Sequence, residues 1–248
     1  MAWHDEPNHP FAGIAEKLKR SKENIFDLNS EIERFFNEGD YPAIPENDHE
    51  TLLKAIEYHK NRVAPPRFSV LAGEVIHHLR SCFDHIVWHF STGPKLNNMP
   101  VDFPVFPEEP IEKNELARFE GKIQRITNPK VRELIEGLQP YKSPSPFDDP
   151  LFIIHNFDIV DKHRELLLCP SAGTRVLPNS MKPLIEGYQR AHPELNSAQV
   201  QAYFKDYGPL QPCIAFRNFG QRKIHPAIPG LMDLFQYTFN AVDRFAVL

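Results

Sequence analysis

The segment Phe68–Phe90 holds the longest uninterrupted helical pattern in the sequence. At ~100° per residue, its apolar side chains gather on one side of the predicted helix. They are Val75, Ile76, Leu79, Cys82, Phe83, Ile86, Val87 and Phe90. The other side carries mostly His, Asp and Trp rather than the Lys and Glu of an ordinary solvated face, and Arg80 lies at the border. The segment therefore predicts a buried polar layer or a functional site.

A second long helix is predicted near the N-terminus, where apolar residues alternate at spacings of three and four. The series is Phe11, Ile14, Leu18, Ser21, Ile25, Leu28, Ile32 and Phe35. Ser21 is the one polar member, and it suits a small packing residue or a register device. Residues 1–10 are predicted to be a polar tail. No internal repeat or shift in composition divides residues 11–248, so we expect a single domain there.

The remaining periodic segments are shorter and are separated by prolines. Further helices are predicted at 111–126, 129–138, 150–164, 181–191, 198–207 and 229–248, and strands at 165–169 and 212–219. Segment 51–63 fits either a helix or an exposed strand, and we favour the strand slightly. The pattern predicts a mainly α (α+β) fold, in which a bundle of long helices contains a small antiparallel sheet.

Charge and cysteine content limit the classes of function. The formal net charge of −5 gives no global basic field to attract nucleic acid or anionic lipid, although a local basic patch is compatible with it. The N-terminus lacks the features of a signal peptide, and no apolar run approaches 18 residues, so no membrane span is expected. Three widely spaced cysteines without a CxxC pair predict reduced thiols and a cytoplasmic location.

Arg80 and His85 form the main candidate for chemistry. Five residues on a helix turn through ~140°, so both side chains project toward the same half of the surface. Such a pair could cleave RNA without a metal, because the imidazole can move the proton of a ribose hydroxyl while the guanidinium stabilises charge on the phosphate. Asp84 would orient the pair. The candidate catalytic residues are therefore Arg80, Asp84 and His85.

The spacing of Arg80 and His85 resembles the Arg-x4-6-His motif of HEPN-domain ribonucleases, which also have a long first helix. The resemblance implies RNA as a partner, a HEPN-like helical bundle, and a homodimer, since HEPN-like sites form across dimer contacts. This chain departs from the family in three respects. Ser81 follows the arginine where HEPN motifs commonly carry Asn, Asp or His, HEPN domains are shorter than this chain, and they lack an obvious sheet.

Four motifs in order resemble a group of uncharacterised bacterial proteins more closely. They are LRSCFDHIVW at 79–88, FPVF at 103–106, LQPY at 138–141 and DKHR at 161–164. The resemblance implies that the helix around 80 and the helix ending near 164 belong to one unit. It implies no activity. The DKHR residues Asp161, His163 and Arg164 are candidates for contacting a phosphate or an RNA backbone. We favour the alternative interpretation, in which the cations of this motif stabilise the C-terminus of the helix.

A structural interpretation competes with the catalytic one. Arg80 and Asp84 are spaced as a helical ion pair, and Asp84 or Asp161 could orient His85 or His163. Such a network would fix the register of two helices. The protein would then be a non-enzymatic interaction or regulatory module.

A metal-dependent hydrolase is the second alternative. His78 and His85 share a face of one predicted helix, and His155, Asp161 and His163 lie on another. The sequence lacks HExxH, and only Glu74 and His77 make an ExxH pair, with none on the second helix. We therefore assign no metal ligands and no cofactor.

Overall fold

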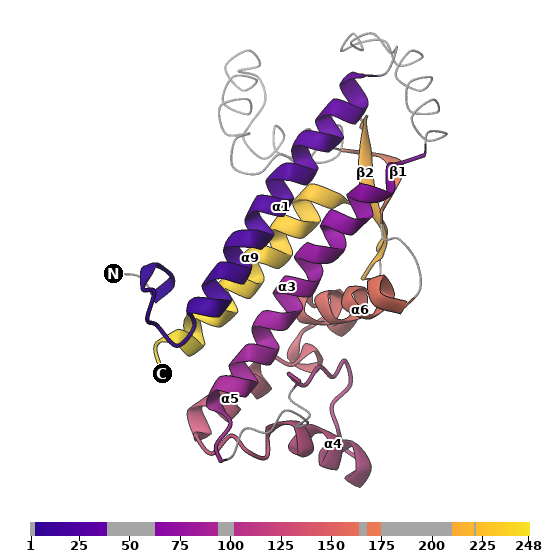
Figure 1. Cartoon of the computed structure of the whole chain (residues 1–248). Coiled ribbons are helices and arrows are strands. Elements are labelled where there is room, and N and C mark those ends of the chain that lie inside the picture. The colour runs from indigo at the N-terminus through magenta and orange to yellow at the C-terminus, as the bar shows by residue number, and fades with distance from the viewer. Residues whose placement is uncertain (1–2, 39–62, 94–101, 164–167, 175–209, 221) are drawn as a thin grey trace, which may run out of the picture.

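Three long helices, α1 (Ala12–Asn37), α3 (Pro66–Phe90) and α9 (Ala227–Ala246), run side by side (Figure 1). This computed structural model describes residues 3–38, 63–93, 102–163, 168–174, 210–220 and 222–248. The helix α1 packs against both α3 and α9, and α6 (Pro150–His163) packs against α3 and α9. The shared core of these four helices confirms the predicted mainly α fold.

The apolar stripe of α3 lies in the core as predicted. The side chains from Val75 to Val87 on this stripe are at most 1% exposed, and Phe90 is half-buried. Arg80, expected at the border, is also buried at 5% exposure. Pro66 occupies the first turn of the helix, where its missing N–H leaves no intrahelical bond unmade.

The predicted seam of α1 is confirmed, and it faces α3 and α9. Every seam residue from Phe11 to Ile32 is buried, including Ser21, whose Oγ donates to the carbonyl of Lys17 at 2.9 Å. The seam also contains Asn24, which is fully buried and which the spacing of apolar residues did not single out. The buried face of α1 is therefore more polar than its heptad pattern indicates.

Paired contacts show that α1 and α3 are antiparallel. Arg67 at the start of α3 pairs with Glu31 near the end of α1, and Asn24 donates to Glu74 at 2.8 Å. At the other end, the ring of Phe11 meets that of His89 at 5.2 Å between centroids. The order of residues is reversed between the two helices, so each turn of α3 faces a defined turn of α1.

Two short helices lie near the C-terminal end of α3 (Figure 1). They are α4 (Lys113–Ile123), which begins with a capping box between Glu112 and Glu115, and α5 (Pro129–Gly137). Both helices begin and end within a few residues of the predicted bounds, 111–126 and 129–138. Two single 3₁₀ turns, η2 (Pro140–Lys142) and η3 (Pro146–Asp148), lead from α5 to α6.

The sheet has three antiparallel strands in the order β1 (Leu168–Thr174), β2 (Leu210–Phe219) and β3 (Arg222–Pro226). The first strand continues beyond the predicted segment 165–169, and β3 was not predicted, because its polar residues and proline lack an apolar alternation. Gly220 turns the chain between β2 and β3 at φ +60°, a conformation that favours glycine. The ring of Phe216 stacks on Phe157 at 4.9 Å and joins the sheet to α6.

The prediction of a polar tail at residues 1–10 is wrong for Trp3. This side chain lies in a single 3₁₀ turn, η1 (Trp3–Asp5), is 8% exposed, and donates from Nε1 to Asp243 of α9 at 2.9 Å. A tryptophan contributes enough apolar area to anchor a segment whose other residues are polar.

Several predictions fall outside the described residues. They are the strand proposed for segment 51–63, of which only Val63 is described, and the two helices at 181–191 and 198–207. None of the described helices is long and apolar enough to cross a membrane.

Gly73 on α3 is predicted to make room for the Asp161 side chain of α6. A Cβ placed on Gly73 would lie 2.5 Å from both carboxylate oxygens of Asp161. We expect Gly73→Ala to lower the free energy of unfolding by about 1–3 kcal/mol, measured by urea denaturation. Gly121→Ala on the exposed face of α4 meets no atom within 4 Å and is the matched control, with an expected gain of about 0.5–1 kcal/mol.

The contact itself is tested by repeating the Gly73 substitution in an Asp161→Ala background. Removing the carboxylate makes room for the new methyl group, so most of the loss should disappear. An unchanged loss would contradict the contact.

Candidate functional site

Arg80 reaches from α3 into the space between α6 and the segment that follows Asp102. Its Nη1 donates to Asp84 at 2.6 Å, its Nη2 donates to the carbonyl of Phe103 at 3.0 Å, and its Nε makes a longer contact of 3.4 Å with Nδ1 of His155. The guanidinium is therefore partnered at each of its three nitrogens. A buried cation of this kind needs such partners, because an unpaired one would be very costly.

Asp84 completes a closed arrangement with Arg80 and the backbone of Phe103. Its Oδ1 accepts from Arg80 and also from the Phe103 amide at 2.8 Å. Burial raises the pKa of Asp84, and the Arg80 charge and the Phe103 N–H oppose that rise. One residue of an extended segment is thus held through both its N–H and its C=O.

Phe103 gains a third attachment from its side chain. The ring is fully buried and meets the ring of Phe83 edge-on at 5.1 Å between centroids. The neighbouring residues are held in the same way, since Gln139 donates to the carbonyl of Pro104 at 2.9 Å and accepts from the amide of Phe106 at 3.2 Å. The FPVF and LQPY motifs thus meet in space, and buried side chains replace the backbone pairing that an isolated extended segment lacks.

His155 on α6 is held as a neutral imidazole. Burial lowers its pKa to about 4, and the charges of Arg80 and Lys122 act in the same direction. Because Arg80 donates to Nδ1, the proton of the neutral ring belongs on Nε2. The ring therefore serves Arg80 as an acceptor.

His85 does not join this arrangement. It is exposed, and its pKa is lowered first by partial burial and then by the charge of Lys17 on α1, against an opposing effect of Asp84. Arg80 turns toward α6 and Phe103, whereas the cation that lowers the pKa of His85 is Lys17 on α1, the opposite neighbour of α3. The structure thus joins Arg80 with Asp84 and leaves His85 about 140° away around the helix.

A second polar contact between α3 and α6 includes two residues that the sequence did not single out as a pair. Nδ1 of His77 lies 3.0 Å from Oδ1 of Asp158, and Lys162 donates to the other oxygen at 2.6 Å. Asp158 is buried, while the His77 side chain is 52% exposed. One turn earlier on α3, the Asp161 carboxyl lies against Gly73, and burial raises its pKa.

The structure describes less of the other two candidates from the DKHR motif, His163 and Arg164. His163 is the last residue of α6, and Arg164 lies outside the described residues. Their proposed contact with a substrate stays a prediction. For Asp161 the structure shows a packing contact with α3 in place of any convergence with Arg80.

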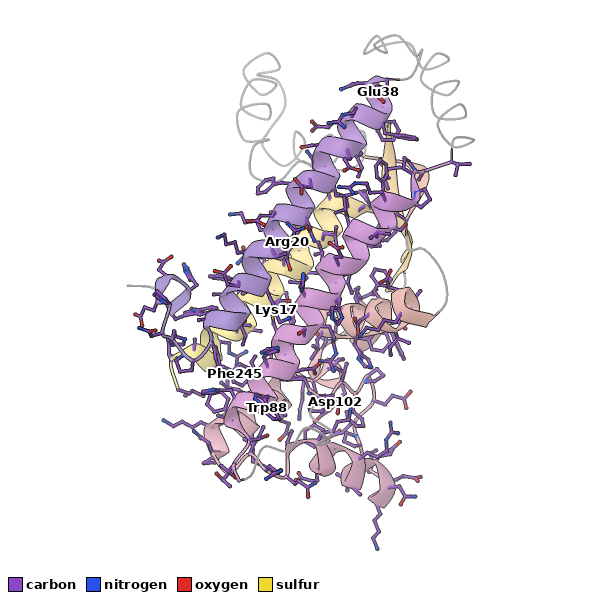
Figure 2. The ribbon with its side chains drawn as sticks, in the orientation of Figure 1. Lys17, Arg20, Glu38, Trp88, Asp102 and Phe245 are labelled. Carbon is purple, nitrogen blue, oxygen red and sulfur yellow. The ribbon has the colours of Figure 1, made fainter. Side chains whose placement is uncertain are left out.

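A separate polar layer lies on the other flank of α3, facing α1. Asn24 and Glu74 form its hydrogen bond. The buried atoms Asn24 Oδ1 and His78 Nδ1 have no hydrogen-bond partner within the described part of the chain. Figure 2 shows Lys17 and Arg20 on the length of α1 that runs beside α3. Periodicity indicated the histidines of this flank but not Asn24.

Nucleophilic catalysis by a cysteine and metal-dependent chemistry have little support among the described residues. The Cys82 thiol is fully buried, and burial raises its pKa to about 12, so it is a poor nucleophile. Within residues 3–38, 63–93 and the other described ranges, no three His, Cys, Asp or Glu side chains are arranged to share a metal ion.

Comparison with family models, curated proteins and solved structures finds no match for this chain. The resemblances to the group of uncharacterised bacterial proteins and to HEPN ribonucleases stay predictions.

His155 is predicted to make the stability of the fold depend on pH. The unfolded chain binds a proton at this residue near pH 6.5, whereas the folded protein does so near pH 4. Between those values, protons favour unfolding, so stability falls as the pH falls. The contribution lost by pH 4 is about 2–3 kcal/mol, with allowance for partial exposure.

The matched variant is His155→Gln, which keeps an acceptor for Arg80 but does not titrate. Urea denaturation at pH 7, 6, 5 and 4.5 should show the wild type losing more stability than the variant as the pH falls. Buried carboxyl groups such as Asp84 titrate in both proteins, so only the difference is informative. Parallel curves would show that His155 does not carry the effect.

Proposed function

We propose that the protein is a non-enzymatic interaction module in which Arg80, Asp84 and His155 form a structural network. The observation that carries this proposal is the position of Arg80. Its guanidinium is 5% exposed and is bonded to the Asp84 carboxylate and the Phe103 carbonyl. A residue that clamps a substrate phosphate needs donors that the substrate can reach, and these donors are already engaged within the protein.

The network has a clear structural purpose in this account. Among the described residues, the segment from Asp102 to Phe106 pairs with no strand, and Arg80 and Asp84 satisfy the backbone of Phe103. His155 brings α6 to the same arginine. The interaction surfaces then lie on the exposed side of the helices that the network positions. RNA and a second copy of the chain are the predicted partners, and the cytoplasm is the predicted location.

The experiment that tests the proposal compares Arg80→Ala with Arg67→Ala. Removing the buried Arg80 from its ion pair with the half-buried Asp84 is expected to cost up to about 3–5 kcal/mol of stability, because the carboxylate loses its counter-charge. Arg67 lies on the same helix, and its ion pair with Glu31 is exposed, so its loss should change the melting temperature little. Thermal unfolding followed by circular dichroism measures both.

A folded Arg80→Ala protein with wild-type stability would contradict the structural interpretation. In that case the guanidinium would be dispensable for the fold, and a role in chemistry would become the better account of its presence.

A HEPN-like, metal-independent endoribonuclease is the second candidate, and one observation favours it. His85 is exposed, and its lowered pKa keeps the imidazole neutral at neutral pH, as a general base requires. In the predicted roles, His85 moves the proton, Arg80 clamps the phosphate, Asp84 orients the pair, and His163 and Arg164 assist. Because Asp84 and Phe103 already engage Arg80, Lys17, whose charge acts on the pKa of His85, would be the cation that meets a phosphate there.

The two candidates are separated by incubating the protein with labelled RNA in EDTA. The interaction module should leave the RNA intact, in both the wild type and His85→Ala. Cleavage by the wild type that is lost in a stably folded His85→Ala variant would replace the first proposal with the second.

A further inference from the structure

Basic side chains gather along the solvent-facing boundary between α1 and α3. Lys17 and Arg20 stand on α1, and His78 and His85 stand on α3; we call these four residues the α1–α3 ridge. Seven residues separate the two histidines, which places them on one face of α3 about 10.5 Å apart along its axis. The antiparallel contacts at Glu31–Arg67 and Asn24–Glu74 bring the α1 cations beside that face.

The basic groups of the ridge are close enough to affect one another. The charge of Lys17 lowers the pKa of both His78 and His85, and Arg20 and His77 add to the effect on His78. Glu74 opposes the shift at His78, and Asp84 opposes it at His85. Burial is the largest cause at both rings. The cations of α1 and the histidines of α3 are thus near enough to interact, which agrees with the antiparallel packing of the two helices.

The carboxylates beside the ridge are already engaged. Glu74 accepts from Asn24, Asp84 accepts from Arg80, and Glu23 forms an exposed pair with Arg20 at 3.4 Å. Lys17 has no ion pair among the residues that the structure describes. An approaching anion would therefore meet Lys17 without an ion pair, whereas Arg20 would exchange its exposed partner Glu23 for the anion.

An exposed aromatic side chain continues the ridge. Trp88 is three residues beyond His85 on α3 and is 37% exposed, and Figure 2 places it toward the end of that helix. Side chains three apart on a helix are neighbours on its surface. Proteins that bind single-stranded nucleic acid combine a positive track for the backbone with aromatic rings on which bases stack.

We propose that the α1–α3 ridge binds single-stranded RNA, with Lys17, Arg20 and the protonated forms of His78 and His85 contacting phosphates and Trp88 stacking on a base. The inference rests on the proposed interaction function and names its partner. A small phosphate compound is a poorer fit, because the cations follow two helices and do not converge on one point. The net charge of −5 restricts binding to this local surface.

The test is fluorescence anisotropy with a labelled oligouridine of 20 nucleotides, in EDTA, at several salt concentrations. Reversing two charges in Lys17→Glu/Arg20→Glu should weaken binding at least ~10-fold and reduce the slope of log affinity against log salt by about 1.5–2. The matched control is Lys19→Glu/Lys22→Glu. Both lysines are exposed on the same helix, but they lie off the ridge, so the control should stay within about 2-fold of the wild type.

Two further arms identify the ligand. Trp88→Ala should weaken binding about 5-fold to 100-fold if a base stacks on the ring. The affinity should rise as the pH falls from 8 to 5.5, because phosphate contact favours the protonated histidines, and the double variant His78→Gln/His85→Gln should remove this rise.

Several results would overturn the proposal. They are equal losses in the ridge and control variants, tight binding of duplex RNA that ignores Trp88→Ala, and displacement of the oligouridine by equimolar pyrophosphate. Lys17→Gln/Arg20→Gln replaces the charge-reversed variant if circular dichroism shows that the latter is unfolded. The Arg80 comparison measures folding and this one measures binding by folded proteins, so either can fail while the other stands.

Discussion

The positions of several segments in this structure depend on one buried guanidinium group, that of Arg80. Arg80 lies within the helical core at 5% exposure, where a charge is tolerated only with close and well-oriented partners. Asp84 supplies the opposite charge from the next turn, and the Phe103 carbonyl and the His155 ring supply the remaining acceptors. The path of the chain after Asp102 and the position of α6 both follow from this requirement.

The two flanks of α3 use polar groups differently. Toward α6, polar side chains find partners within the protein, as in the contact of His77 with Asp158 and the seating of Asp161 against Gly73. Toward α1, Arg20 is exposed and Lys17 is half-buried, and the buried atoms of Asn24 and His78 lack partners in the described structure. The polar groups on the α6 flank therefore stabilise the packing of two helices, whereas some polar atoms on the α1 flank have no partner in the described structure.

The sequence predicted the helices better than it predicted their partners. The apolar spacing of α1 and α3 placed Leu18, Leu79 and their neighbours correctly, because helical periodicity reports which face is buried. The same periodicity could not identify the Phe103 backbone as the partner of Arg80, since that contact joins segments 23 residues apart. The burial of Trp3 was not predicted for a similar reason, because its partner Asp243 is near the other end of the chain.

The candidate site was predicted in part. The i,i+4 spacing of Arg80 and Asp84 led directly to their ion pair, and the angle of about 140° between Arg80 and His85 already allowed them to have different neighbours. Which neighbours they have depends on how α1 and α6 pack on α3, and no local pattern contains that information. The sequence did not pair His77 with Asp158, because that contact needs two helices to meet.

The protection of the Phe103 amide from hydrogen exchange tests the central claim most directly. If Arg80 and Asp84 hold the segment 102–106 in place, this N–H should exchange about as slowly as amides in the middle of α3, such as that of Phe83, because Phe103 is fully buried and its amide is bonded to the Asp84 carboxylate. Exchange as fast as that of an exposed residue such as Glu108 would contradict the claim, since it would show that the network does not hold the segment.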